Sequence, residues 1–201
     1  TDKVAMAQIV YDGVWRTRHA GLSILLQTFN RKTDIPVKFG LKELRLSDSD
    51  IFNAPVLYLT GHEYFELDGK EMTMLREYLS SGGFLFAEAC CGRKGFDLAF
   101  RRIMQQVFPS NPLQRIDPNS SLFRVPNDVR AVGITPTLAA DLGRNASSPR
   151  LEGVDLDGHF AVIYSPLALA GGWEMSQSPY ARGCNSVGSI QIGQNVLMYA
   201  V

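Results

Sequence analysis

Short apolar runs that alternate with segments of helical spacing constrain the fold of this chain more than any other feature. The clearest runs are residues 4–11, 54–61, 84–89 and 159–166, and a shorter one covers residues 35–40. A strand is apolar along its whole length when both faces of its sheet are covered, which is typical of parallel sheets. The runs therefore predict the strands of a buried, mostly parallel sheet.

The segments between these runs carry apolar residues at the spacing of amphipathic helices. The best-marked helix begins after Asp68, because Glu71 follows at the spacing of a capping box, and it ends at Gly82 and Gly83. The inward-facing residues of the four predicted helices are Leu22, Leu25, Leu26 and Phe29; Met72, Leu75 and Leu79; Phe96, Phe100, Ile103, Met104 and Val107; and Ile190, Val196, Leu197 and Ala200.

Strands that alternate with helices predict a three-layer α/β sandwich, in which helices cover both faces of the sheet. Right-handed crossovers between parallel strands make such a sandwich doubly wound. The 201 residues suffice for one domain with its own core. Prolines break residues 110–153 into turns and short extended pieces, so we expect an irregular insertion there. Because the chain begins at Thr1, we also expect it to be part of a longer protein.

The charge balance disfavours some classes of partner. Lys and Arg together number 20, as do Asp and Glu, so the net charge is zero. This argues against binding to nucleic acid or to an anionic membrane surface, both of which favour a basic protein. No apolar run approaches the roughly 20 residues that cross a bilayer. The three cysteines are Cys90, Cys91 and Cys184, an odd number with two adjacent, which predicts reduced thiols.

In doubly wound sandwiches, ligands bind beyond the carboxyl ends of the strands. Polar and aromatic residues follow four of the predicted strands at that edge. We therefore expect a site there for a small polar ligand or a protein partner, although loop polarity alone gives a similar pattern. The residues expected to line it are Asp12, Trp15, Arg16, Glu88, Cys91, Arg93, Ser165 and Trp173. Trp173 is equally compatible with an anchor of the core.

Residues 88–92, with the sequence E-A-C-C-G, have the features of a nucleophile elbow: a strand, a sharp turn and a helix, with small residues around the nucleophile. Cys90 takes the central place, and the following helix N-terminus would lower the pKa of its thiol. A thiol nucleophile also needs a base, and His62 or Glu63 follows a neighbouring strand. The alternative is that Cys90 and Cys91 are small residues that fill a tight turn.

No pair of metal ligands has a recognised spacing, so the sequence predicts neither a metal nor a cofactor.

Several strings in the chain resemble a known bacterial family. They are APVLYLTGHEYFEL, LREYLSSGGFLFAEACCGRKGFDLAFRR, LEGVDLDGHFAVIYSP, GGWE and IGQNVLMYA, and they resemble the family called domain of unknown function 4159 over about residues 4–201. The resemblance implies a flavodoxin-like fold similar to class I glutamine amidotransferases. It also favours a parent protein that is periplasmic, secreted or membrane-attached, with a cytoplasmic protein as the alternative. Amidotransferases carry His-x-Glu downstream of the elbow cysteine, and this chain does not, so the resemblance does not imply their usual glutaminase activity.

Three functional hypotheses follow from these observations. The favoured one is a non-catalytic domain that binds a small polar ligand or another protein of its assembly at the carboxyl edge of the sheet. The second is a cysteine-dependent hydrolase or amidotransferase, with Cys90 as nucleophile and His62 or Glu63 as base. The third is a structural module of a multidomain envelope protein. The enzyme hypothesis requires an exposed Cys90 sulfur within hydrogen-bonding reach of its base.

Overall fold

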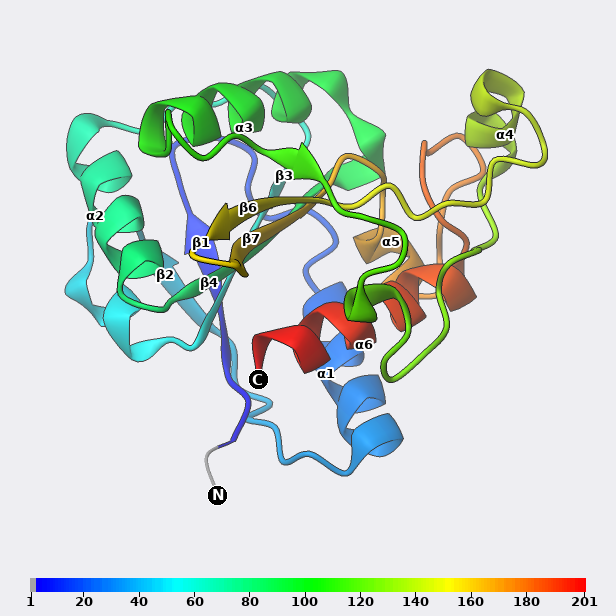
Figure 1. The fold of residues 1–201 in the computed structure, drawn as a ribbon, viewed down its shortest axis with the longest axis horizontal. Coiled ribbons are helices and arrows are strands. Elements are labelled where there is room, and N and C mark those ends of the chain that lie inside the picture. Colours follow the sequence, from blue (N-terminus) through cyan, green and yellow to red (C-terminus); the bar gives the residue numbers. More distant parts are fainter. Residues whose placement is uncertain (1–2) are drawn as a thin grey trace.

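The computed structural model describes residues 3–201, and in them a seven-stranded sheet has helices on both faces (Figure 1). The strand order is β2-β1-β3-β4-β7-β6-β5. The strands are β1 (Met6–Val10), β2 (Lys42–Arg45), β3 (Val56–Gly61), β4 (Phe84–Ala89), β5 (Gln114–Arg115), β6 (Glu152–Leu156) and β7 (His159–Ser165). The five neighbouring strands β2, β1, β3, β4 and β7 run parallel to one another. β6 pairs antiparallel with β7, and β5 pairs antiparallel with β6. The predicted α/β sheet is confirmed, and its antiparallel edge makes it mixed rather than purely parallel.

The strand predicted at residues 35–40 is wrong. In that segment only Val37 pairs, through an isolated bridge to Val4, and the second strand is β2. β2 has the sequence KELR, of which Leu44 alone is buried, because it lies at the edge of the sheet. A short edge strand with charged side chains discourages pairing with other chains, so it lacks the apolar run of a central strand.

Two helical layers cover the sheet. The helices α2 (Gly69–Ser80) and α3 (Lys94–Val107) cover one face, and α1 (Gly21–Thr33), α5 (Ala170–Trp173) and α6 (Ser186–Ala200) cover the other (Figure 1). Successive side chains of β3 serve the two layers in turn: Leu57 and Leu59 pack with the first, and Val56 and Tyr58 with the second. None of the helices in residues 3–201 is both long and apolar enough to cross a membrane.

The four helices predicted from spacing are all present, and their ends follow from local chemistry. The Asp68 side chain accepts from the Glu71 backbone N–H at 2.8 Å, while the Glu71 side chain accepts from the Asp68 N–H at 2.9 Å. This capping box satisfies two free donors at the start of α2. Gly82, at φ 97°, lets the chain turn into β4.

The proline-rich segment 110–153 contains a short helix, α4 (Pro136–Leu142), and a 3-10 turn, η3 (Ser121–Phe123), besides β5. Asn195 of α6 holds part of it, because its side chain accepts from the backbone N–H of Asn127 at 3.0 Å. It also donates to the carbonyl oxygens of Leu122 and Asn127, both at 2.8 Å. These buried contacts hold the segment against the α6 layer.

Candidate active site

Parallel pairing of β3 with β4 brings His62 and the two adjacent cysteines together. Gly61, at the end of β3, is in register with Ala89, at the end of β4, so the residues that follow lie at the same edge of the sheet. His62 Nε2 lies 3.1 Å from Cys90 Sγ, which in turn lies 4.0 Å from Cys91 Sγ. The proximity of His62 to the cysteines, expected from the sequence, is thus present, and we call these three residues the thiol cluster.

The turn is centred one residue later than the sequence indicated. Cys90 is the first residue after β4 and is only 1% exposed, so its side chain lies inside the protein. The chain reverses at Cys91, which has φ 58° and ψ 11° and is half-buried. A non-glycine residue at positive φ at a strand-to-helix turn is the feature of a nucleophile elbow. Cys91 therefore occupies the elbow position, and the assignment of Cys90 to it is wrong.

Gly92 and Arg182 fix this turn. Gly92 has φ 66°, and a Cβ atom there would collide with the backbone carbonyl and the Cβ of Arg182. The backbone N–H of Arg182 donates to the carbonyl oxygen of Cys91 at 3.2 Å. The loop between α5 and α6 thus holds the elbow from outside the sheet.

Glu88 lies beneath the thiol cluster as a buried carboxyl group. Its oxygens accept from the hydroxyl groups of Thr60, at 2.9 Å, and Tyr58, at 3.3 Å. They also accept from the backbone N–H groups of Leu169, at 2.7 Å, and Ala170, at 3.3 Å. Burial raises the pKa of Glu88 even though these four donors lower it in part. The carboxyl group thereby ties the start of α5 to the central strands.

The pKa of one thiol is raised and the pKa of the other is lowered, because the two sulfurs are joined by a hydrogen bond. The hydrogen bond with Cys91, burial and the charge of Glu88 all raise the pKa of Cys90. The pKa of Cys91 is lowered to about 4, first by the hydrogen bond with Cys90, then by the neighbouring His62 and by the charge of Arg18. These directions favour Cys91 as the thiolate of the pair and Cys90 as the thiol that donates to it.

The thiol cluster also has the composition of a metal site. The ligand atoms of His62, Cys90 and Cys91 all lie within 4.8 Å of one another. One imidazole and two thiolates form a ligand set that zinc takes in catalytic sites, where the fourth position stays open. The sequence did not predict a metal site, because no pair of these ligands has a recognised spacing along the chain.

Other residues predicted for this edge lie apart from the thiol cluster. Glu63 is exposed, and its carboxylate makes no hydrogen bond to either sulfur among the described residues. Asp12 is exposed and pairs with Arg45 at 3.1 Å. Arg16 is exposed, and Trp15 packs its half-buried ring against the core. The edge therefore does not gather all the expected side chains into one site.

Three residues predicted to bind a ligand are instead buried, which corrects that assignment. Trp173 is 0% exposed, and its Nε1–H donates to the Ser189 carbonyl oxygen at 2.8 Å, so it is an anchor of the core. Ser165 is buried, and its hydroxyl donates to the Leu167 carbonyl oxygen at 2.7 Å. Glu88 is enclosed as described above. A ligand at the surface cannot contact these three side chains.

An open cavity of about 360 Å³ borders the exposed side of Cys91. The residues that line it are Cys91, Gly92, Arg93, Lys94, Thr137, Ser178, Tyr180, Ala181 and Arg182. Of these, only Cys91 and Arg93 were predicted as ligand-binding. Gly92 and Lys94 are their neighbours along the chain, whereas the other five come from α4 and from the loop that precedes α6, which lie at the same end of the molecule (Figure 1). No local sequence signal links these segments to the elbow.

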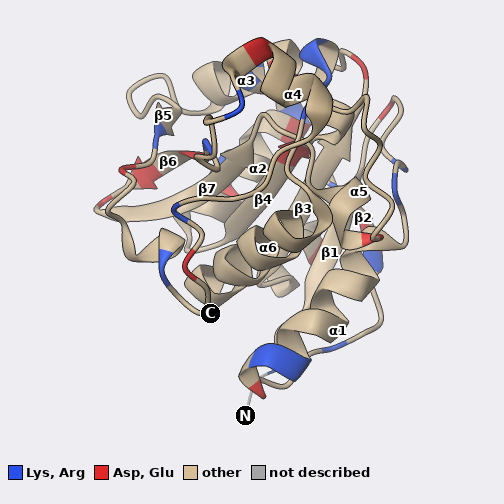
Figure 2. Cartoon of the chain, turned by 90° about the vertical axis from the view of Figure 1, so that its right-hand side faces the viewer, with Lys and Arg blue, Asp and Glu red and all other residues tan. Residues whose placement is uncertain are grey.

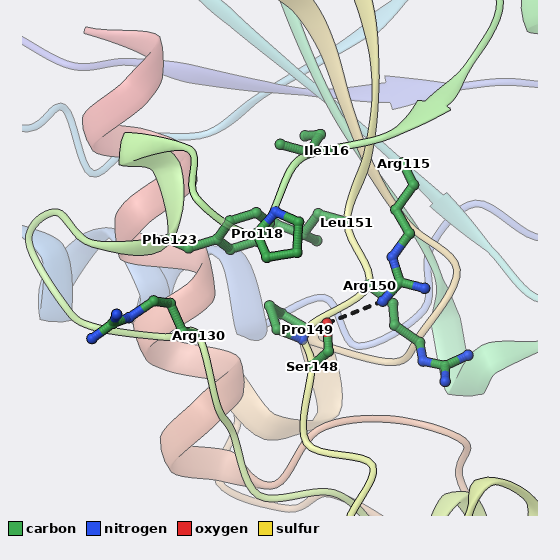
Figure 3. Close-up of a pocket in the computed structure, with 9 residues that line it drawn as sticks. All are labelled: Arg115, Ile116, Pro118, Phe123, Arg130, Ser148, Pro149, Arg150 and Leu151. Carbon is green, nitrogen blue, oxygen red and sulfur yellow. Dashed lines mark hydrogen bonds between the residues drawn. The ribbon is translucent and has the colours of Figure 1, made fainter.

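A second depression in segment 110–153 is too small for a ligand. Arg115, Arg130 and Arg150 surround an apolar floor that includes Phe123 and Leu151, and Arg115 donates to Ser148 (Figure 3). Its volume is about 10 Å³, which is room for one water molecule. Asp128 also neutralises Arg130 at 2.5 Å.

The fold and this edge define an α/β sandwich domain that carries a cysteine–histidine cluster at the carboxyl ends of its parallel strands. The chain belongs to the family described as Domain of unknown function (DUF4159), which it matches over residues 5–201. The resemblance seen in the sequence is confirmed to that extent. No curated protein matches the chain.

Proposed function

We propose that this domain is a cysteine-dependent hydrolase or acyl transferase in which Cys91 is the nucleophile and His62 carries the proton. The observation that carries the proposal is the position of Cys91, a half-buried thiol at positive φ with Cys90 and His62 around it. A non-catalytic binding edge, which the sequence favoured, does not require an acidic thiol. Perturbed acidity in a cleft is typical of reactive groups.

The chemistry balances with the residues present. The Cys91 thiolate attacks the carbonyl carbon of an acyl group, forming a C–S bond, and the bond to the leaving group breaks. Protonated His62 gives its proton to the leaving group. Neutral His62 then takes a proton from water, which attacks the thioester, releases the acid and restores the thiolate. Cys90 stabilises the thiolate between turnovers through its S–H group.

The proposal includes a resemblance to flavodoxin-like proteins, which the strand order supports. The parallel strands follow the order β2-β1-β3-β4-β7, which has the connectivity of flavodoxin-like sheets. The thiol cluster lies at the carboxyl ends of β3 and β4, the edge at which such folds bind ligands. The lack of His-x-Glu after the cysteines is offset by His62, which comes before them.

Reaction with p-nitrophenyl acetate tests the proposal. We expect a burst of p-nitrophenolate equal to the amount of protein, and an acetyl group on Cys91 by mass spectrometry. Cys91→Ser should abolish the burst. Cys184→Ser should leave it intact, because Cys184 is buried and lies outside the thiol cluster. A burst that survives Cys91→Ser, or acetylation only after unfolding, would overturn the proposal.

A zinc site is a second candidate, favoured by the ligand atoms of His62, Cys90 and Cys91 within 4.8 Å. Titration of the reduced protein with Co²⁺ tests it, because thiolate ligands give an intense charge-transfer absorption. One equivalent with two thiolate ligands, lost in His62→Ala and in Cys90→Ser, would support the zinc site. A spectrum that does not differ from that of free Co²⁺ would exclude it.

A further inference from the structure

The cavity beside Cys91 is basic although the protein as a whole is neutral. Arg93, Lys94 and Arg182 line it, and none of the described residues that line it is acidic. The chain has equal numbers of basic and acidic residues, and Figure 2 shows positions of both kinds distributed along the chain. Three cations on one cavity therefore mark a local concentration of positive charge.

Two of these cations have no partner to neutralise them. Arg93 and Lys94 are exposed and form no ion pair with residues 3–201. Arg182 is different, because it pairs with Asp141 of α4 at 2.8 Å. Arg18, which also acts on Cys91, pairs with Glu174 at 3.4 Å. Arg93 and Lys94 thus supply the charge that is available to a ligand.

The start of α3 adds to this charge. The helix spans 14 residues from Lys94, and the side chain of its N-cap residue, Arg93, makes no capping hydrogen bond in the described structure. Backbone N–H groups of a first helical turn attract anions, as does the positive end of the helix dipole. The basic side chains and the helix terminus point to the same kind of ligand.

The size and hydrogen-bonding groups of the cavity narrow the ligand class. A volume of about 360 Å³ suits a small molecule rather than a polymer. Ser178 and Tyr180 contribute hydroxyl groups to the lining, while the Thr137 hydroxyl already donates to the Pro179 carbonyl oxygen at 2.8 Å. Arginine matches the planar oxygens of a carboxylate or a phosphate with two parallel hydrogen bonds.

We propose that the cavity binds an anionic oxygen group, carboxylate or phosphate, of a small substrate whose acyl carbon lies at Cys91. Arg93 and Lys94 hold the anionic group. Because Cys91 lines the same cavity, the acyl carbon that it attacks is the one that lies beside its sulfur when the anion is bound. The inference rests on the proposed function in placing the reacting atom at Cys91. The anion site itself follows from the lining residues alone.

Alkylation with two reagents of similar size tests this inference. Iodoacetate carries a carboxylate, and iodoacetamide is neutral. We expect the ratio of their rates at Cys91 to exceed the ratio for the same unfolded protein by about tenfold at low salt, and to fall as salt is added. Arg93→Gln with Lys94→Gln should return the ratio to the unfolded value. Arg31→Gln with Lys70→Gln removes equal charge from exposed sites elsewhere and should leave the ratio unchanged.

The outcomes separate the two proposals. Rapid iodoacetamide reaction with an ordinary ratio overturns the anion site and leaves the nucleophile. Failure of both reagents overturns the nucleophile, and a second measurement then decides on the anion site. Succinate and inorganic phosphate serve as probes of thermal unfolding: a rise in Tm that is lost in the Arg93→Gln, Lys94→Gln variant supports the site and shows which oxyanion it prefers. Where neither reagent reacts, no rise in Tm with either probe overturns the anion site.

Discussion

The backbone N–H of Arg182 donates a 3.2 Å hydrogen bond to the carbonyl oxygen of Cys91, although the two residues lie far apart in the sequence. This contact joins the turn after β4 to the loop before α6. It holds Cys91 in a left-handed conformation and places the side chain of Arg182 on the cavity that Cys91 borders. The conformation of the thiol therefore depends on how this loop packs.

Gly92→Ala should break this arrangement. Gly92 lies at φ 66°, and the added methyl group would collide with the Arg182 carbonyl group. We expect a loss of about 1–3 kcal/mol in the free energy of unfolding, measured in urea, because both strain and displacement of the loop contribute. Gly69→Ala is the matched control, since nothing lies near its added Cβ at the start of α2. Equal stability of the two variants would contradict the close approach of Arg182.

Local signals predicted much of the fold because they act within a few residues. Asp68 and Glu71 are three positions apart, so the sequence was sufficient to predict the capping box. The apolar runs predicted the central strands because both faces of β3 and β4 are covered. The sequence of β2 carries no such run, because edge strands owe their pairing to position rather than to composition.

The site was predictable only in part, for a different reason. Parallel strands that end at one edge place His62 beside the cysteines, which the sequence allowed provided that the two strands are neighbours in the sheet. Which cysteine takes the left-handed conformation depends on the contact between Gly92 and Arg182, which no local pattern encodes. Trp173 follows two glycines as a residue at the rim of a site would, but the packing of α5 against α6 buries it.

Replacement of Glu88 should reveal the role of its buried carboxyl group. Glu88→Leu leaves the Leu169 N–H and the Tyr58 hydroxyl without their partner, so we expect a loss of about 3 kcal/mol in unfolding free energy. Glu88→Gln keeps one oxygen for the backbone N–H groups, and the hydroxyl groups of Thr60 and Tyr58 can rotate to accept from its amide. We expect it to be far milder.

The stability difference between the wild type and Glu88→Gln should depend on pH in a defined direction. Burial raises the pKa of Glu88 above 4.5, so the folded state binds this proton more tightly than the unfolded state does. Stability relative to Glu88→Gln should therefore be greatest below the unfolded pKa, and should fall as the pH rises through the folded pKa. Urea unfolding of both proteins across the acidic range measures the difference. A difference that grows with pH in favour of the wild type would refute this assignment.

Arg101 and Arg102 offer a test of half-buried against exposed ion pairs on α3. Arg101 bonds Glu152 through two contacts, at 2.6 and 2.9 Å, and also Asp97 at 3.0 Å. Arg102 pairs with Glu66 at the surface. We expect Arg101→Gln to lower the free energy of unfolding by about 1–3 kcal/mol, because it separates α3 from β6. Arg102→Gln should change the stability little, because its ion pair with Glu66 is exposed to solvent, and equal losses would contradict the structural difference.

Removal of the Cys90 thiol should make Cys91 less acidic. The pKa of Cys91 is lowered to about 4 mainly by the hydrogen bond from Cys90, and next by His62. In Cys90→Ala, the pH midpoint of iodoacetamide reaction at Cys91 should shift upward, toward the free-thiol value of about 8.5. His62→Gln should shift it in the same direction by a smaller amount, and Cys184→Ala should not shift it.

The wild type should also gain stability over Cys91→Ala as the pH rises from about 4 to 9, because the folded state holds the thiolate in that range. If Cys91 instead titrates near 8.5 in the wild type, Cys90 donates no proton to it and the thiol cluster has no acidic member.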